Sequence, residues 1–338
     1  MNITSSKRSA GAFRSQKEAR RYWITLSVMS VLAILFAMGL LLYKNPVPMT
    51  SPSFWPVVRR RTTALIAMAI AALCQSMGTV TFQSITGNRI ITPSLLGFDA
   101  LYGTINTAIV FFFGSNMLVK IDGLPSFCIQ VLLMMLLSGL LYGTLLKDSY
   151  KDMQFVLLIG IIIGSGLRSL SAFMRKVLSP SDFDVLQAKM LGSVNNADSS
   201  YFVVAIPLVI TAVLVINLAA RRLNVVALGA DTAKVLGVDH RKHMLFFLLM
   251  VSVLMAVSTA LVGSLTFYGF LVAAFTYRLV PSYDHRYMFP MAMVFAFLVI
   301  TASYFFMYHV FNAQGVVSVI MELFGGVIFL IMLLRKGE

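Results

Sequence analysis

The chain has 338 residues, of which 59% are hydrophobic and only 12% are charged. Soluble proteins carry about 25% charged residues, so this composition excludes an ordinary soluble domain and predicts an all-α polytopic membrane protein. The formal net charge is +14. Lys and Arg collect on the cytoplasmic loops of membrane proteins, so this excess fits a lipid bilayer. No patch of basic and aromatic residues indicates nucleic-acid binding.

Residues 1–21 are basic and contain no long apolar run, which predicts a cytoplasmic N-terminus. The apolar run at 22–42 is longer than a typical signal-peptide core and lacks a clear cleavage site, so we expect an uncleaved first helix. Residues 22–334 then form a single transmembrane domain, and residues 335–338 form a cytoplasmic tail.

Eight apolar runs are each long enough to cross a bilayer, which takes roughly 20 apolar residues. They lie at residues 22–42, 62–82, 95–113, 127–146, 201–220, 244–265, 287–308 and 316–334. Two shorter runs, 155–167 and 267–277, could be buried, re-entrant or spanning. With both short runs the chain has about ten transmembrane helices and both termini are cytoplasmic. With neither, the segment at 228–242 lies outside the cell, and the distribution of Lys and Arg barely separates the two topologies.

Polar segments between these runs predict two short surface helices. The loop 177–200 could carry one around residues 183–190. The segment LGADTAKVLGVDHRK, residues 228–242, separates two long apolar runs. Within it, Asp231 can cap a short helix by accepting backbone N–H bonds, and Gly237 can end that helix in a left-handed conformation. We expect a compact helix of one to two turns at the membrane surface.

Several segments resemble, in matching order, the vitamin B12 and iron-siderophore permease family of ABC importers. The stretch QSITGNRIITPSLLGFDALYG at 83–103 is similar to the family's loop after the second helix, and ARRLNVVALGADTAKVLGVD at 220–239 is similar to its coupling region. Further similar segments are LQAKMLGSVNNAD at 186–198, GSLTFYGF at 263–270 with the Asp-His-Arg that follows at 284–286, and GVVSVIMELFGGVIFLIMLLRKG at 315–337. The resemblance implies a fold of about ten transmembrane helices of this permease type.

Three positions depart from the family pattern. The usual Pro-His pair of the eighth helix is replaced within residues 272–275, the Gly-Ala-Pro of the last helix reads Gly-Gly-Val at 325–327, and a common arginine is Met307. The chain resembles most a divergent branch that imports iron-siderophore complexes beside a second, non-identical permease. A heterodimer is therefore expected, with a homodimer as the alternative.

The resemblance implies that residues 221–243 are the coupling segment, which inserts into a groove on a separate ABC ATPase subunit. The candidate coupling residues are Leu228, Gly229, Asp231, Thr232, Lys234, Val235, Leu236, Gly237 and Asp239. An ordinary capped cytoplasmic loop helix is the alternative interpretation of the same residues.

Arg59, Arg60 and Arg61 fall on the outer side in the ten-helix topology, against the positive-inside bias. In the family, outer arginines pair with glutamates of a periplasmic or lipid-anchored substrate-binding protein, and the resemblance implies that docking role here. Rim ion pairs of this kind steer docking more than they add affinity. His309 could replace the arginine that is absent at Met307. Headgroup anchoring is the alternative for the arginines, and a plain interfacial residue is the alternative for His309.

Four polar residues within apolar runs are candidates to line the transport path. They are Gln75, Gln83, Asp99 and Glu322. An intramembrane acid is costly and is a functional candidate by default. Asp99 can instead stabilise a helix start, Glu322 can pair with a cation such as Arg168, and the glutamines can hydrogen-bond between helices.

Motifs for catalysis within the chain are absent from the sequence. There is no Walker motif, no HExxH, no Cys-x-x-Cys and no triad-like cluster, so we expect no cofactor, no metal site and no enzymatic activity. The resemblance then implies a permease in the bacterial cytoplasmic membrane that moves iron(III)-siderophore complexes and is driven by a separate ATPase. Vitamin B12 or haem is the alternative cargo. A secondary transporter is the alternative class, and it would need intramembrane ion-coupling pairs, for which the sequence offers only Asp99 and Glu322.

Overall fold

The computed structural model describes residues 11–43, 51–52, 54–120, 123–148, 153–190, 193–194, 197–311 and 317–334, and every regular element in these ranges is a helix. The elements are α1 (Gln16–Leu42), α2 (Phe54–Thr86), η1 (Pro93–Leu96), α3 (Phe98–Phe113), α4 (Ser115–Lys120), α5 (Leu124–Asp148), α6 (Met153–Val177), α7 (Pro180–Met190), η3 (Ser199–Tyr201), α8 (Phe202–Leu218), α9 (Ala220–Val226), α10 (Ala230–Val235), α11 (His240–Val262), α12 (Thr266–Leu279), α13 (His285–His309) and α14 (Val317–Leu334). The predicted all-helical fold is confirmed.

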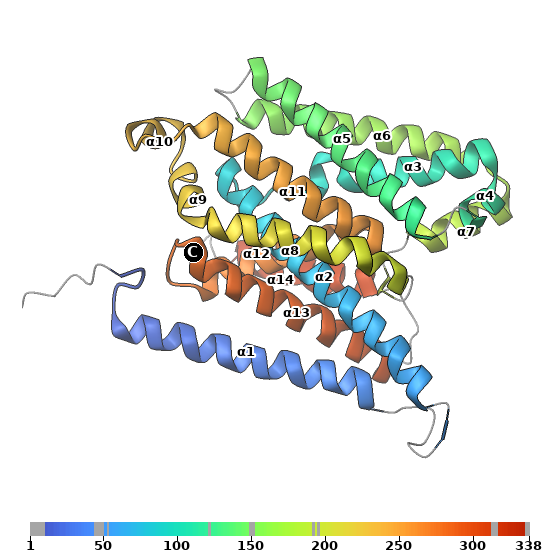
Figure 1. Ribbon diagram of the computed structural model, residues 1–338, viewed down its shortest axis with the longest axis horizontal. Coiled ribbons are helices and arrows are strands. Elements are labelled where there is room, and N and C mark those ends of the chain that lie inside the picture. The colour runs from blue at the N-terminus through green and yellow to red at the C-terminus, as the bar shows by residue number, and fades with distance from the viewer. Residues whose placement is uncertain are drawn as a thin grey trace, which may run out of the picture.

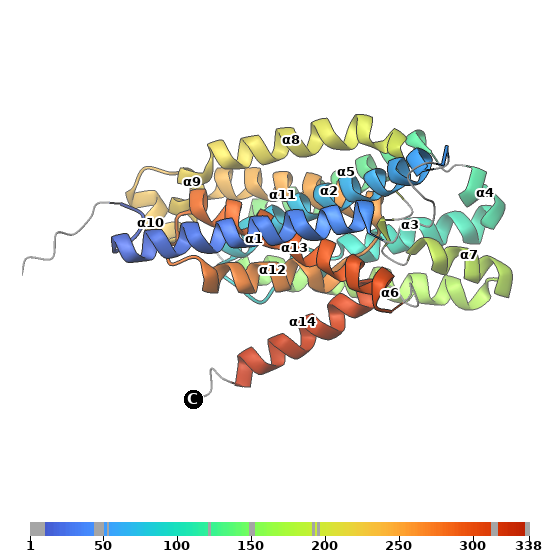
Figure 2. The same ribbon diagram turned by 90° about the horizontal axis from the view of Figure 1, so that it is seen from below.

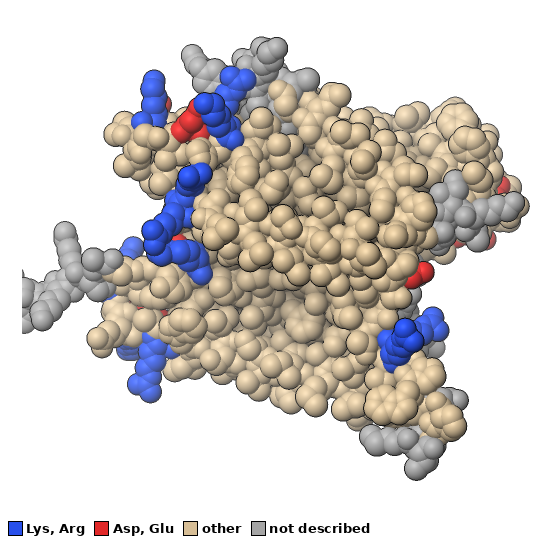
Figure 3. All heavy atoms as spheres, in the orientation of Figure 1, with Lys and Arg blue, Asp and Glu red and all other residues tan. Residues whose placement is uncertain are grey.

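The long helices lie side by side and give the molecule two distinct ends (Figures 1 and 2). The short helices α9 and α10 lie at one end, and α4 and α7 lie at the other. Lys and Arg gather at the α10 end, with a second group over the N-terminal part of α2 (Figure 3). The ten-helix topology places the α10 end in the cytoplasm, and this placement stays a prediction.

Among the described residues, six helical segments are long and apolar enough to cross a membrane. They are Gln16–Leu42, Phe54–Thr86, Leu157–Val177, Ser199–Leu218, His240–Val262 and His285–His309. The short apolar run at 155–167 is therefore part of a full-length helix, because α6 continues past Arg168. The run at 267–277 lies in α12, which has 14 residues and spans only about 21 Å at 1.5 Å per residue.

Helices α2 and α11 are the most deeply buried candidate spans, and α12 and α13 pack against α2. Small side chains allow this packing. A Cβ atom added at Gly269 of α12 would lie only 2.3 Å from Thr79 Oγ1 of α2. Buried polar contacts also join these helices, since Gln75 Nε2 donates to Ser258 Oγ of α11 at 3.2 Å. Such contacts between polar side chains hold helices together in lipid.

Candidate functional site

The segment at 228–242 folds into the short helix α10, bounded by two glycines with positive φ angles. Gly229 (φ 94°) is the N-cap, and no side-chain oxygen caps this end, so the prediction that Asp231 is the cap is wrong. Asp231 lies within the first helical turn, where a carboxylate favours the helix dipole without capping it. Gly237 (φ 75°) ends the helix as predicted. The Gly237 N–H donates to the Lys234 carbonyl oxygen at 3.1 Å, and the Val238 N–H donates to the Ala233 carbonyl oxygen at 2.9 Å. These two hydrogen bonds form the Schellman pattern.

Helix α10 projects from the bundle and exposes apolar side chains at the end rich in Lys and Arg (Figures 1 and 3). Val235 is 87% exposed, Leu228 60% and Leu236 56%, whereas Ala233 is fully buried beneath them. All nine candidate coupling residues are exposed. An exposed apolar group with a polar rim indicates an interaction surface. We refer to Leu228, Val235 and Leu236 as the apolar knob.

The final candidate coupling residue, Asp239, has a capping role. Its Oδ1 accepts the backbone N–H of Lys242 at 3.1 Å, which caps α11, and the Lys242 ammonium lies 3.2 Å from Oδ2. These contacts lower the pKa of the Asp239 carboxyl. The chain that follows α10 is thus fixed by two successive features, the glycine turn at Gly237 and the cap of α11.

A partly buried side-chain cluster at the same end connects α9 with the N-terminus of α13 and the C-terminus of α2. Asn224 contacts both Asp284 and His285, and the His285 ring also contacts Ser84 of α2. Asp284 is the N-cap of α13 and pairs with Arg286. Burial acts to raise the pKa of Asp284, but hydrogen bonds from Arg286 and Asn224 and the Arg286 charge outweigh it, so the pKa is about 2. Sequence reasoning missed Asn224, because its partners lie 60 and 61 residues away along the chain.

The three arginines at the opposite end have different surroundings. The Arg61 guanidinium donates to the carbonyl oxygens of Leu40, Leu41 and Tyr43 at 3.1–3.2 Å and so binds the C-terminus of α1. Arg59 and Arg60 are exposed and line an open surface hollow. Arg61 therefore has a structural role, and the docking prediction rests on Arg59 and Arg60.

His309 ends α13 close to this region. Its ring lies 5.0 Å from the ring of Tyr43 and 4.7 Å from that of Phe305. The same Tyr43 supplies one of the carbonyl oxygens that Arg61 contacts. His309 and the arginine cluster thus meet at the C-terminus of α1, although they are more than 240 positions apart in the sequence.

Helix α6 has one buried face and one exposed face. Leu157, Gly160, Gly164, Ser171 and Met174 are buried at helical spacing. Thr104 of α3 binds this face, since its Oγ1 lies 2.8 Å from Ser171 Oγ. The exposed face carries polar side chains among apolar ones, and its polar members are Ser165, Arg168, Ser169 and Lys176. A charged residue is costly against lipid, so this face suits water or another protein chain. We call these four residues the polar stripe.

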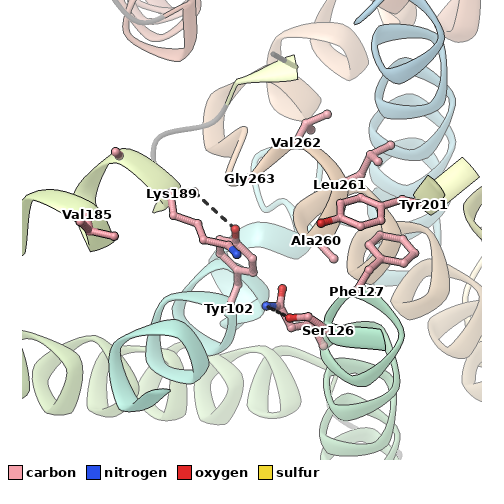
Figure 4. A pocket seen from close by; sticks show the side chains of 12 residues that line it. Tyr102, Ser126, Phe127, Val185, Lys189, Tyr201, Ala260, Leu261, Val262 and Gly263 are labelled. Carbon is pink, nitrogen blue, oxygen red and sulfur yellow. Dashed lines mark hydrogen bonds between the residues drawn. The ribbon is translucent and has the colours of Figure 1, made fainter. Parts of the chain in front are cut away.

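A pocket of about 310 Å³ opens among α3, α5, α7 and the C-terminus of α11 (Figure 4). Its polar lining includes Tyr102, Ser126, Gln130 and Lys189, and the stacked rings of Phe127 and Tyr201 form one wall at 4.9 Å. Gln130 Nε2 donates to Ser126 Oγ at 3.4 Å. The sequence analysis did not predict this pocket, because its lining residues come from elements that lie far apart in the sequence.

Comparison with known proteins decides the family. The FecCD transport family model matches residues 22–335. The chain belongs to the FecCD transport family. It is 55% identical over 335 residues to the petrobactin import system permease protein FatC of Bacillus anthracis, which covers 99% of this chain and 95% of that protein.

Two further relatives and one solved structure extend this comparison. The petrobactin import system permease protein YclO of Bacillus subtilis (strain 168) is 34% identical, over 82% of this chain and 89% of that protein. The petrobactin import system permease protein FatD of Bacillus anthracis is 23% identical, over 82% and 81%. A metal-chelate type ABC transporter, solved in an inward-facing conformation, has the same fold: the TM-score is 0.79, with 18% identity and 92% of this chain and 99% of that chain covered.

In this FecCD-family chain, three of the four candidate path residues make contacts between or within helices. Gln75 binds Ser258, and Gln83 Nε2 donates to the Arg89 carbonyl at 2.8 Å. Asp99 lies in the first turn of α3, and its Oδ2 accepts from Ser264 at 2.7 Å and from Thr266 at 3.0 Å. Glu322 lies on α14, and its side chain is outside the part of the chain that the structure describes. A role for these residues in the transport path stays a prediction.

Proposed function

We propose that this chain is the membrane-spanning permease subunit of an importer that carries iron(III)-siderophore complexes into the bacterial cytoplasm. The observation that carries the proposal is the 55% identity to a petrobactin import permease over 99% of the chain. Petrobactin, or a siderophore of the same chemical class, is the proposed cargo. The sequence contains no nucleotide-binding motif, so ATP hydrolysis is assigned to a separate chain.

The apolar knob is the proposed contact with that ATPase. It is exposed, held by two ordered turns and placed at the end of the bundle rich in Lys and Arg. Both termini lie on this cytoplasmic side in the proposed topology. An apolar side chain such as Val235, which is 87% exposed, suits a groove on a protein surface better than open water.

A second permease chain is the proposed partner for the polar stripe of α6. Its Arg168 side chain is exposed, and among the described residues the guanidinium donates to Ser165 Oγ, one turn away, at 3.2 Å. A second chain facing α6 would enclose a water-filled path between the two stripes and remove these groups from lipid. This chain is similar to both FatC and FatD of Bacillus anthracis, at 55% and 23% identity, which supports a heterodimer of two different permeases.

A substrate-binding protein is the proposed partner at the opposite end. The exposed Arg59 and Arg60 would meet acidic side chains of that protein, and His309 lies close to the same region. Charge pairs at an exposed rim act mainly on the rate of association and on orientation. Binding of the loaded protein should therefore weaken steeply with salt when these arginines are present.

Growth on defined iron sources tests the cargo. In a strain that lacks its own siderophore permeases, this chain and its partner subunits should restore growth on ferric petrobactin and leave haem use unchanged. Restored growth on haem alone, or on neither source, would contradict the assignment.

Pull-down of the ATPase tests the knob. Val235→Asp should abolish co-purification of the ATPase, because it places a charge in an apolar contact, while Val235→Thr, which keeps the shape of the side chain, should retain it. Equal co-purification with both variants would show that the knob is not the contact.

A further inference from the structure

The side chain of Asn224 is bound on three sides by the N-terminus of α13. Its Oδ1 accepts from the His285 backbone N–H at 3.0 Å and lies 2.5 Å from His285 Nδ1, and its Nδ2 donates to Asp284 Oδ1 at 3.0 Å. The orientation of the amide is fixed by chemistry: reversed, it would set an NH₂ group against the His285 N–H and an oxygen against the Asp284 carboxylate. An amide is needed here, because the site requires an acceptor and a donor in one planar group.

The His285 ring extends this contact to α2. Because Nδ1 faces an acceptor oxygen, it carries the ring proton, and Nε2 is then an acceptor. Nε2 lies 2.7 Å from Ser84 Oγ in the last turn of α2. His285 itself is only 3% exposed. The Ser84 hydroxyl has a second acceptor in reach, the Val80 carbonyl oxygen at 2.8 Å. The hydroxyl can therefore release His285 and still be hydrogen-bonded.

The contacts continue from α2 to the helix that carries the polar stripe. Gln83, next to Ser84, binds the Arg89 carbonyl in the loop after α2 at 2.8 Å. That loop leads through η1 to Gly97, where an added Cβ would lie 3.1 Å from the Gly164 Cα of α6. At the other end, Asn224 lies on α9, which is followed directly by α10 and the knob. Side-chain contacts together with short chain connections thus link the knob to α6 through α9, α13 and α2.

We propose that Asn224 is a positioning residue that couples movement of α10 to α2 and α13, so that ATP hydrolysis by the partner is converted into opening of the path. The inference rests on the function proposed above and deepens it. Coupling between distant parts of a protein runs through discrete contacts that can exist in two arrangements. The Asn224–His285–Ser84 contacts are of this kind, because the last hydrogen bond can be exchanged for one within α2.

The test uses the complete reconstituted transporter and measures cargo imported per ATP hydrolysed, together with the ATPase rate alone. Asn224→Leu keeps the approximate volume and removes every hydrogen bond of the amide. We expect the ATPase rate to stay within about twofold while import per ATP falls about tenfold, within the usual range of coupling free energies. The matched control is Asn217→Leu, whose amide, on α8, binds the Val213 carbonyl and Met77 Sδ and has no hydrogen bond to α13 among the described residues. Loss of import and hydrolysis in equal proportion, or equal behaviour of the two leucine variants, would overturn the proposal.

Three further variants keep the test decisive if Asn224→Leu fails to assemble. Asn224→Asp places two carboxylates together and should uncouple the transporter. The double variant with Asn224→Asp and Asp284→Asn again pairs one amide with one carboxylate. It should restore import per ATP to within about threefold of the unmodified chain. Ser84→Ala removes the link between His285 and α2, together with the contact of the Ser84 hydroxyl with Tyr277, and should lower the ratio by several-fold. An unchanged ratio in both Asn224→Asp and Ser84→Ala would refute the coupling role. Absence of ATP-driven import by the unmodified chain would refute the proposed function instead.

Discussion

Replacing Gly97 by alanine should destabilise the chain by two separable effects. Gly97 has φ 104° and ψ 5°, and it is both the C-cap of η1 and the N-cap of α3. An L-residue at such a positive φ costs on the order of 1–3 kcal/mol. The new Cβ would also lie 3.1 Å from the Gly164 Cα and 3.6 Å from its nitrogen. Both are backbone atoms of α6 and cannot rotate away, so the helices must separate, at a cost of about 1–3 kcal/mol.

Gly87 offers a control that isolates the second effect. It also has a positive φ, 63°, but an added Cβ would meet no atom within 4 Å. Gly87→Ala should therefore cost only the strain of a left-handed residue, roughly 1–2 kcal/mol. The difference between the two variants measures the close approach of α3 and α6.

Thermal unfolding in detergent can be followed by the reaction of a thiol dye with Cys74, which is fully buried. The partly buried Cys128 is first replaced by alanine in every sample. We expect the unfolding midpoint of Gly97→Ala to fall by about 5 °C or more. This fall should be at least twice that of Gly87→Ala. Equal shifts in the two variants would refute the argument that α3 and α6 are in backbone contact at Gly97.

Three further predictions follow from particular contacts. Arg61→Ala should lower the melting midpoint by several degrees, because hydrogen bonds to the end of α1 are lost, while Arg60→Ala should leave it unchanged and weaken binding-protein association; equal midpoints would contradict this. The pKa of Asp284 is lowered to about 2, so its carboxylate stabilises the fold above the unfolded pKa of 3.8, and this stabilisation is lost as the pH falls toward 2. The free energy of unfolding should therefore be larger than that of Asp284→Asn by on the order of 1 kcal/mol after screening. This difference should be constant from pH 8 to 5 and shrink below about pH 4, and a change between pH 8 and 6 would count against it. Gly269→Ala should be strongly destabilising because its Cβ would meet Thr79 Oγ1 at 2.3 Å, and Thr79→Ala in the same chain should recover part of the loss; no recovery would place the clash elsewhere.

The helical fold could be predicted from the sequence because each membrane-spanning helix is a local run of apolar residues. The short run at 155–167 is ambiguous because Arg168 follows it, yet α6 has 25 residues in all and continues past Arg168 to Val177. The physical reason is its two faces: Gly160 and Gly164 are buried, whereas Arg168 is exposed. Average hydropathy cannot show which face a charged residue takes.

In the candidate sites, features that depend on local sequence could be predicted, and features that depend on distant partners could not. The left-handed turn at Gly237 was predictable, because glycine itself supplies that conformation. The cap at Asp231 was not, because Gly229 occupies the N-cap position and the helix begins two residues earlier than a cap at Asp231 would require. The roles of Arg61 and Asn224 depend on partners about 20 and 60 residues away, which a single sequence does not bring together.

Import of radioactive iron supplied as ferric petrobactin tests the central claim most directly. The cells lack their own siderophore permeases and produce this chain with the ATPase, second permease and binding protein of the same transport system. The account predicts iron accumulation with the unmodified chain and none above background with Val235→Asp, at equal amounts of chain in the membrane. Full accumulation with Val235→Asp, or none with the unmodified chain, would contradict it.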